Sequence, residues 1–140
     1  MNFYLFIATV SLAFQLGVLA LLIVGFGFKQ RLRFRLHGFF MLTAVALHLI
    51  IIGVIMVPSF VAIIIEKPTS SIGLFAPFHA AAGTTTAILG VWIVGGWRLR
   101  QTTKFCAPKR KFIRATSIMW LFTLSLGVIF YFILNWSLFG

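Results

Sequence analysis

The sequence predicts an all-α integral membrane protein, a four-helix up-down bundle with its N- and C-termini outside. Of its 140 residues, 61% are hydrophobic and only 9% are charged, whereas a soluble domain carries about a quarter charged residues. Four stretches are long and apolar enough to cross a bilayer, which takes roughly 20 residues each. The basic residues gather in two of the connecting segments, and this asymmetry predicts the orientation.

The expected spans are four apolar runs that contain no Lys, Arg, Asp or Glu. They form a single transmembrane domain over residues 1–140, with spans at about 3–28, 37–57, 77–97 and 115–136. At a rise of about 1.5 Å per residue, 20 residues cover about 30 Å, the thickness of the hydrocarbon core. The first span has no basic segment before it and exceeds the roughly 7–15 apolar residues of a signal peptide. We therefore expect it to be a span and not a cleaved signal.

The charges predict which segments face the cytoplasm. Eleven basic residues lie in segments 29–35 and 98–114, whereas segment 58–76 holds one, Lys67. Cytoplasmic segments are enriched in Lys and Arg, so both termini are expected outside. The same residues are expected to contact anionic lipid headgroups.

Composition excludes several function classes. Cys106 is the single cysteine in the sequence, which excludes an internal disulfide and the cysteine pairs of zinc modules. Glu66 is the single acidic residue, which excludes hydrolysis by a pair of carboxylates. No soluble segment is long enough for a nucleic-acid-binding surface, so no nucleic acid is expected as a partner. We expect a non-enzymatic protein.

The short connections make sequential spans antiparallel neighbours. The segment after the second span contains Pro58, a helix-breaking residue, followed by an apolar run at 60–65. We expect this run to lie on the outer membrane surface. The alternative is that the second helix continues past Pro58.

The third span is rich in small residues. Gly83 and Ala87 form a small-xxx-small pair, as do Thr86 and Gly90. Such pairs allow two helices to approach closely in a membrane. The threonines at 84–86 are expected to bond their own helix backbone.

Three histidines are the only ionisable residues within the spans, and such residues are functional candidates. His37 and His48 fall on one helix face, about 16 Å apart along the axis. His48 and His79 belong to adjacent antiparallel spans. Their expected difference in depth is about 10 Å by helix rise, which uncertain span ends can reduce to a few Å.

Two neutral imidazoles that face each other across the iron hold a b-type haem. His48 and His79 come closest to this arrangement, and Gly83 with its neighbouring alanines leaves room for the macrocycle. Copper held by histidine with Met41 or Met56 is a weaker alternative, because no clustered His–Met motif is present. A histidine bonded to a carbonyl or threonine explains each site equally well.

Several of these features recur together in a known family. The second span follows a basic run and begins at His37, followed by Met41, and the third opens with Pro77-Phe78-His79. The fourth follows the basic run 109–114 and carries four further residues of the pattern: Thr116, Trp120, Gly127 and Tyr131. From His37 to the C-terminus the chain resembles the small membrane proteins of the CtaM/YozB type, which share a domain of unknown function.

The resemblance implies a multi-pass protein of a prokaryotic plasma membrane that serves in maturation of haem-copper oxidases. Family members have four recurring histidines, and His37 and His79 match two of them. Lys109 stands at about the place of a third. The fourth, near the outer end of the second span, is missing, and His48 stands elsewhere. The chain thus resembles a divergent member of this family, and the four-histidine site does not carry over.

The leading interpretation is an oxidase-maturation factor that holds or hands over haem or metal through His37, His48 and His79, or scaffolds a respiratory subunit. One alternative is an electron-transfer subunit with haem b between His48 and His79. The other is an accessory subunit of a larger membrane complex, with structural histidines. In each case the expected partners are membrane lipids and other membrane protein subunits, a respiratory oxidase among them.

Overall fold

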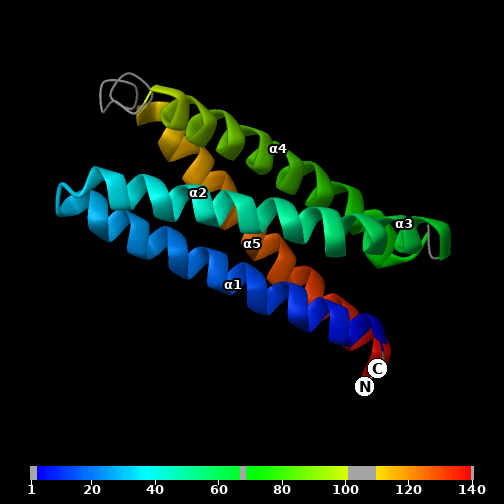
Figure 1. Ribbon diagram of the computed structural model, residues 1–140. Coiled ribbons are helices and arrows are strands. Elements are labelled where there is room, and N and C mark those ends of the chain that lie inside the picture. Colours follow the sequence, from blue (N-terminus) through cyan, green and yellow to red (C-terminus); the bar gives the residue numbers. More distant parts are fainter. Residues whose placement is uncertain (1–2, 67–68, 101–109, 140) are drawn as a thin grey trace.

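The computed structural model describes residues 3–66, 69–100 and 110–139, which are almost entirely helical. The elements are α1 (Phe3–Gln30), α2 (Phe34–Ile51), the π-helix η1 (Ile52–Met56), α3 (Val57–Glu66), α4 (Ser71–Arg100) and α5 (Arg110–Phe139). Four helical stretches are long and apolar enough to cross a membrane: Leu5–Gln30, Phe34–Glu66, Ser71–Trp97 and Lys111–Ile133. They pack as an up-down bundle (Figure 1), which confirms the predicted all-α four-helix architecture.

A tight turn makes α1 and α2 antiparallel neighbours. Leu32 adopts a left-handed backbone conformation with φ of 58°. The Arg33 N–H donates to the Phe28 carbonyl at 2.9 Å, and the Leu32 N–H donates to the Lys29 carbonyl at 3.1 Å. These two bonds form a Schellman motif, which satisfies carbonyls at the end of α1 before the chain reverses.

The second span continues as a helix through Pro58 and reaches Glu66. This confirms the alternative prediction, and the expected surface segment at 60–65 was wrong. The π-helix η1 precedes this proline, and the Val57 N–H bonds to the Ile52 carbonyl, five residues back. Pro58 has no N–H for the Val54 carbonyl, and its ring would clash with that carbonyl in a regular helix. The wider π turn provides the extra space. Residues 60–65 therefore belong to α3, in line with α2, and do not form a separate segment.

The third span begins one and a half turns earlier than the sequence pattern indicates. Ser70 caps α4, because its hydroxyl accepts a hydrogen bond from the Gly73 N–H at 3.1 Å. Serine is among the preferred residues at this capping position. Pro77, expected to open the span, lies inside α4. It deprives the Gly73 carbonyl of its usual helical donor.

The small-residue face of α4 packs closely against its neighbours, as predicted. A methyl group added at Gly90 would lie 3.3 Å from Val45 and 3.6 Å from Trp120. One turn away, the Thr86 and Thr123 hydroxyls lie 3.2 Å apart, and each also bonds its own helix backbone. The buried core extends from here across all four long helices: Val18, Leu22, Ala44, Val45, Ile51, Val94 and Trp120.

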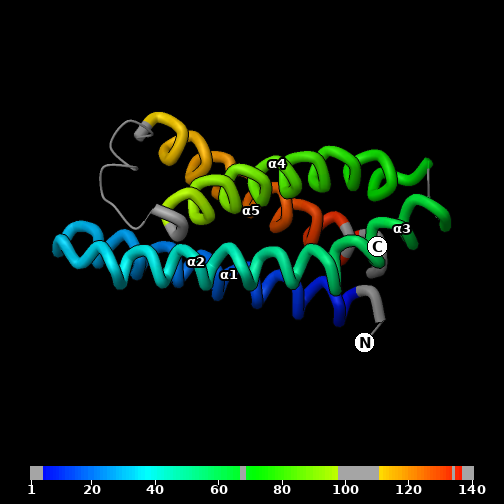
Figure 2. Tube along the Cα trace, turned by 45° about the horizontal axis from the view of Figure 1, so that its top comes forward, coloured from blue at the N-terminus to red at the C-terminus, as the bar shows by residue number. Residues whose placement is uncertain are grey.

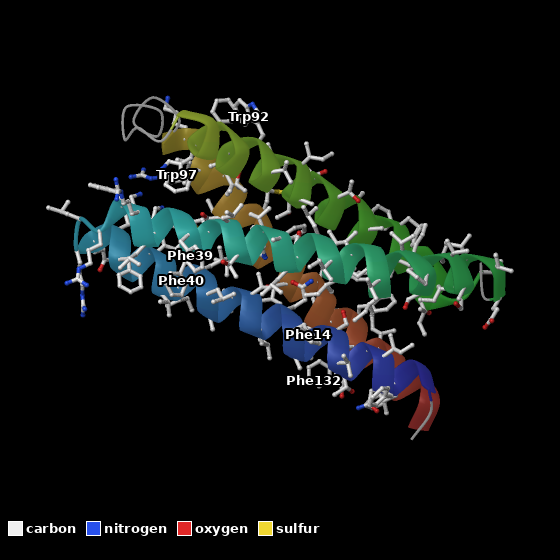
Figure 3. All side chains as sticks on the ribbon, in the orientation of Figure 1. Phe14, Phe39, Phe40, Trp92, Trp97 and Phe132 are labelled. Atoms are coloured by element: carbon white, nitrogen blue, oxygen red, sulfur yellow. The ribbon has the colours of Figure 1, made fainter. Side chains whose placement is uncertain are left out.

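The outer surface of the bundle is apolar. Phe14, Phe39 and Phe132 are each more than half exposed and point away from the helices (Figure 3). Exposed aromatic side chains around a long helical bundle are unfavourable in water but suit a hydrocarbon environment. This surface agrees with a multi-pass membrane protein.

The start of α1 and the end of α5 lie together at one end of the bundle (Figures 1 and 2). The Thr9 and Tyr131 hydroxyls, 3.4 Å apart, join the two helices near this end. The basic segment 29–35 lies at the opposite end, with the start of α5. Lys67 and residues 101–109, which include Lys104, Cys106 and Lys109, lie outside the described residues.

The side of the membrane that each end faces is testable by cysteine labelling. In a Cys106→Ser background, Thr69→Cys is expected to react with a membrane-impermeant maleimide in intact cells. Lys111→Cys is expected to react only after permeabilisation, because the basic end should face the cytoplasm. Labelling of Lys111→Cys in intact cells would reverse the predicted orientation.

The packing of Trp97 against α2 predicts a position-specific stability effect. The Trp97 indole occupies the place that a Cβ at Gly38 would take, whereas no heavy atom lies within 4 Å of a Cβ at Gly17. Gly38→Ala should therefore lower stability by about 1–3 kcal/mol through overpacking. Gly17→Ala should be neutral or stabilise by up to about 1 kcal/mol. Thermal unfolding in detergent, followed by circular dichroism, measures both; equal effects would contradict the packing.

Candidate functional site

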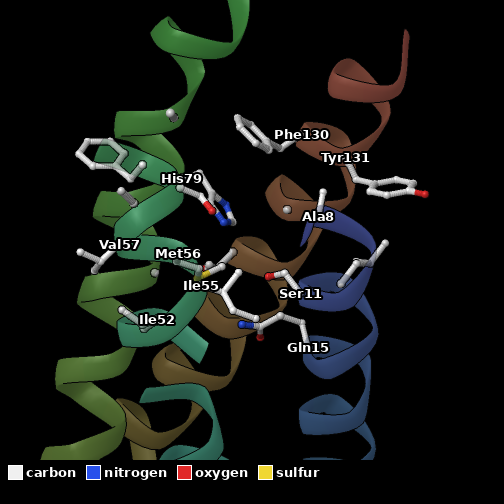
Figure 4. A pocket seen from close by; sticks show the side chains of 18 of the residues that line it. Ala8, Ser11, Gln15, Ile52, Ile55, Met56, Val57, His79, Phe130 and Tyr131 are labelled. Atoms are coloured by element: carbon white, nitrogen blue, oxygen red, sulfur yellow. The ribbon is translucent and has the colours of Figure 1, made fainter. Parts of the chain in front are cut away.

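The bundle encloses a cavity of about 350 Å³ between its four long helices (Figure 4). This volume lies near the lower end of the roughly 300–1,000 Å³ typical of small-ligand sites. Most of the lining is apolar. The polar lining includes Gln15 from α1, His48 from α2, and His79 from α4, and Trp120 from α5 lies beside them. The cavity therefore combines an apolar wall with a few polar groups.

Two features of the fold create this space. Towards the end where the chain begins, α1 runs alongside α5 and away from α3 (Figure 1). Small residues line the cavity where larger side chains would fill it, including Ala8, Ala80, Gly83 and Gly127. The cavity is not sealed, because its lining residues Val57 and Glu66 are exposed.

His48 is the most deeply placed polar residue of the site, with 2% of its surface exposed. Its Nδ1 lies 3.2 Å from Nε2 and 3.3 Å from Oε1 of Gln15, itself buried. One of the two side chains thus donates to the other, and this contact fixes the imidazole between α1 and α2. Trp120 covers the ring, with centroids 4.7 Å apart. The second nitrogen, Nε2, is buried and has no hydrogen-bond partner.

His79 enters the same cavity from α4 (Figure 4). Its ring stacks near Phe130, with centroids 6.1 Å apart and planes at 13°. A methyl group added at Gly127 would lie 3.3 Å from His79 Cε1, so the glycine lets the ring pack closely against α5. The Nδ1 atom is buried without a hydrogen-bond partner.

His37 belongs to a different environment. Its Nδ1 lies 2.7 Å from the Gly25 carbonyl, to which it donates, and its ring packs near Phe26. His37 and Met41 do not line the cavity, which begins three turns further along the span at His48. The structure thus brings two of the three candidate histidines together and gives His37 a bond that ties α2 to α1.

Gln15 and Ser11 were not identified from the sequence as site residues. They lie one turn apart on α1, and both point into the cavity towards α4 (Figure 4). An amide inside an apolar span is itself a signal, because its polar atoms require partners in the membrane. Gln15 was missed because only ionisable residues were considered as site candidates within the spans.

The metal-binding side chains of the cavity are few. Among the described residues no three His, Cys, Asp or Glu side chains form a group able to hold a metal. The cavity offers two imidazoles and the thioether of Met56. Structural zinc takes four protein ligands, so zinc does not fit this set.

A haem needs only two axial ligands from the protein, because its macrocycle supplies the others. The two histidines meet this count, but the surroundings do not suit haem. The described lining of the cavity contains no Lys or Arg that could pair with the propionate groups of haem. The charged residue in the cavity lining is Glu66, whose carboxylate would repel the propionate groups of haem. The residues as arranged therefore do not fit haem.

Comparison with known proteins adds no assignment: no family model, curated protein or solved structure matches the chain.

The Gln15–His48 contact predicts coupled effects on stability. Gln15→Leu and His48→Leu should each lower stability by about 1–3 kcal/mol, because each leaves a buried polar partner unsatisfied. The double variant should lose less than the sum of the two, since no unsatisfied partner remains. Unfolding in mixed detergent micelles measures the cycle. Strict additivity would show that the two side chains do not interact.

Proposed function

We propose that this chain is a non-enzymatic multi-pass membrane protein that holds a small lipid-soluble ligand inside its bundle, as an accessory factor of a larger respiratory complex. The observation that carries the proposal is the cavity shared by His48, His79 and Gln15. It gathers polar groups inside a membrane bundle, where they are costly to place.

The unsatisfied nitrogens favour a binding role over a purely structural one. A buried polar atom without a partner costs about 1–3 kcal/mol, and both His48 and His79 carry such an atom. A structural histidine is expected to resemble His37, which donates to a carbonyl. A ligand with polar atoms offers a means of offsetting this cost.

A non-enzymatic role agrees with the residue types at the cavity. Its only carboxylate is that of Glu66, which lies at an exposed position, away from the buried His48. Acid–base catalysis by a pair of carboxylates has no counterpart there. Binding and release require only the polar and apolar groups that are present.

The respiratory assignment rests on the resemblance to CtaM/YozB-type proteins, whose bacterial members serve in oxidase maturation. We propose the same kind of partner here, a haem-copper oxidase or one of its subunits. The exposed apolar faces of α1, α2 and α5 offer surface for contact with such a subunit within the bilayer. The basic end is proposed to contact anionic lipid headgroups.

Filling the cavity tests the proposal with a matched pair of variants. Ala80 lines the cavity, whereas its neighbour Ala81 is exposed and does not. Ala80→Phe should displace any ligand, and Ala81→Phe should leave the cavity open. Mass spectrometry of organic extracts from the purified proteins is expected to find a small molecule with the wild type and Ala81→Phe and to find at least tenfold less with Ala80→Phe.

The same variants test the cellular role. Deletion of the gene should lower the oxidase activity of membranes, and Ala81→Phe should restore it while Ala80→Phe should not. Equal accumulation of the two proteins, checked by immunoblotting, controls for folding. Full restoration by Ala80→Phe would show that the cavity is not the functional part of the molecule.

A further inference from the structure

We infer that the ligand of this cavity is a lipid quinone: a neutral, planar ring with carbonyl oxygens and a long apolar tail. The inference rests on the proposed binding function and names its ligand class. Four properties of the cavity carry it: its hydrogen-bond donors, its charge, its flat aromatic walls and its apolar path to the membrane.

The donors lie where a quinone head would need them. Gln15 and Ser11 reach into the cavity from α1, and His79 reaches towards them from α4 (Figure 4). An amide carries two N–H donors, so Gln15 can serve His48 with one and a ligand with the other. Quinone carbonyls are acceptors only, and donors from two sides suit the two oxygens on opposite edges of the ring.

The charge of the cavity favours a neutral head. Its lining contains no Lys or Arg, and Glu66 is the carboxylate at its exposed end. A phosphate or carboxylate headgroup inside would lack a cationic partner in a low-dielectric environment, which is strongly unfavourable. Among the described residues, the basic ones lie at the opposite end of the bundle.

The walls favour a flat ring. Trp120 lies against His48, and Phe130 lies nearly parallel to His79. Aromatic groups pack well against a planar ligand in offset or edge arrangements. Gly83 lines the same space without a side chain, which leaves room for a ring beside α4.

An apolar path connects this region to the membrane. Ile52, Ile55 and Ile63 line the cavity along the second span, and Val57, also part of the lining, is 51% exposed. A quinone dissolved in the bilayer can enter between α1 and α3, which diverge here. Its apolar tail then lies along these isoleucines and Val57. A water-soluble ligand gains nothing from such a path.

Binding of decylubiquinone to the purified protein in lipid nanodiscs tests the inference. Bound quinone is quantified after gel filtration, with empty nanodiscs as the correction for partition into lipid. The wild type should bind one equivalent, and Gln15→Leu should weaken the affinity about tenfold, as expected for one lost hydrogen bond. Gln30→Leu, the same change at an exposed position outside the cavity, should bind like the wild type.

The outcomes separate the two proposals. Ala80→Phe should abolish binding, and decylbenzene, which lacks carbonyl oxygens, should not compete. If decylubiquinone fails to bind or decylbenzene competes equally, the quinone inference is overturned. The binding function nevertheless stands if the wild-type extract contains another molecule that Ala80→Phe loses. If the wild type neither binds quinone nor yields any extracted molecule, both proposals fail.

Discussion

Every polar group within a hydrocarbon layer must find its partner inside the protein, and this constraint organises the bundle. Most hydroxyls in the spans satisfy it locally: Thr43, Thr85 and Thr116 each donate to a carbonyl four residues back. His37 satisfies it across helices through the Gly25 carbonyl. Among the described residues, the buried side-chain atoms left without a partner are one nitrogen of His48 and one of His79. Both residues line the cavity.

The same constraint explains how much of the fold was predictable. Spans and connections follow from hydropathy and length, because a helix is the one segment that satisfies its own backbone in lipid. The passage of the second helix through Pro58 did not follow, because a proline normally ends or kinks a helix. Only the π turn at Ile52–Met56 makes room for it. A shift in backbone bonding of this kind leaves little trace in composition or periodicity.

The site was predictable in part for a related reason. Counting ionisable residues identified His48 and His79, and helix rise placed them in neighbouring spans at separate depths. Their relation to Gln15 depends on how α1 rotates against α2, and hydropathy does not specify this rotation. His37 lies apart for another reason: it shares a helix face with His48 but stands three turns away along α2, where its partner is the backbone of α1.

The cavity also bears on stability. Helices associate in membranes through close packing, and an unfilled space forfeits about 24 cal/mol for each Å³ of cavity. Elsewhere the helices pack closely, with Met41 against Gly25 and Trp97 against Gly38. Alanine and glycine at the cavity wall thus make fewer packing contacts than larger side chains would make. A bound ligand would restore those contacts and stabilise the folded state in proportion to its occupancy, so binding and bundle stability are linked.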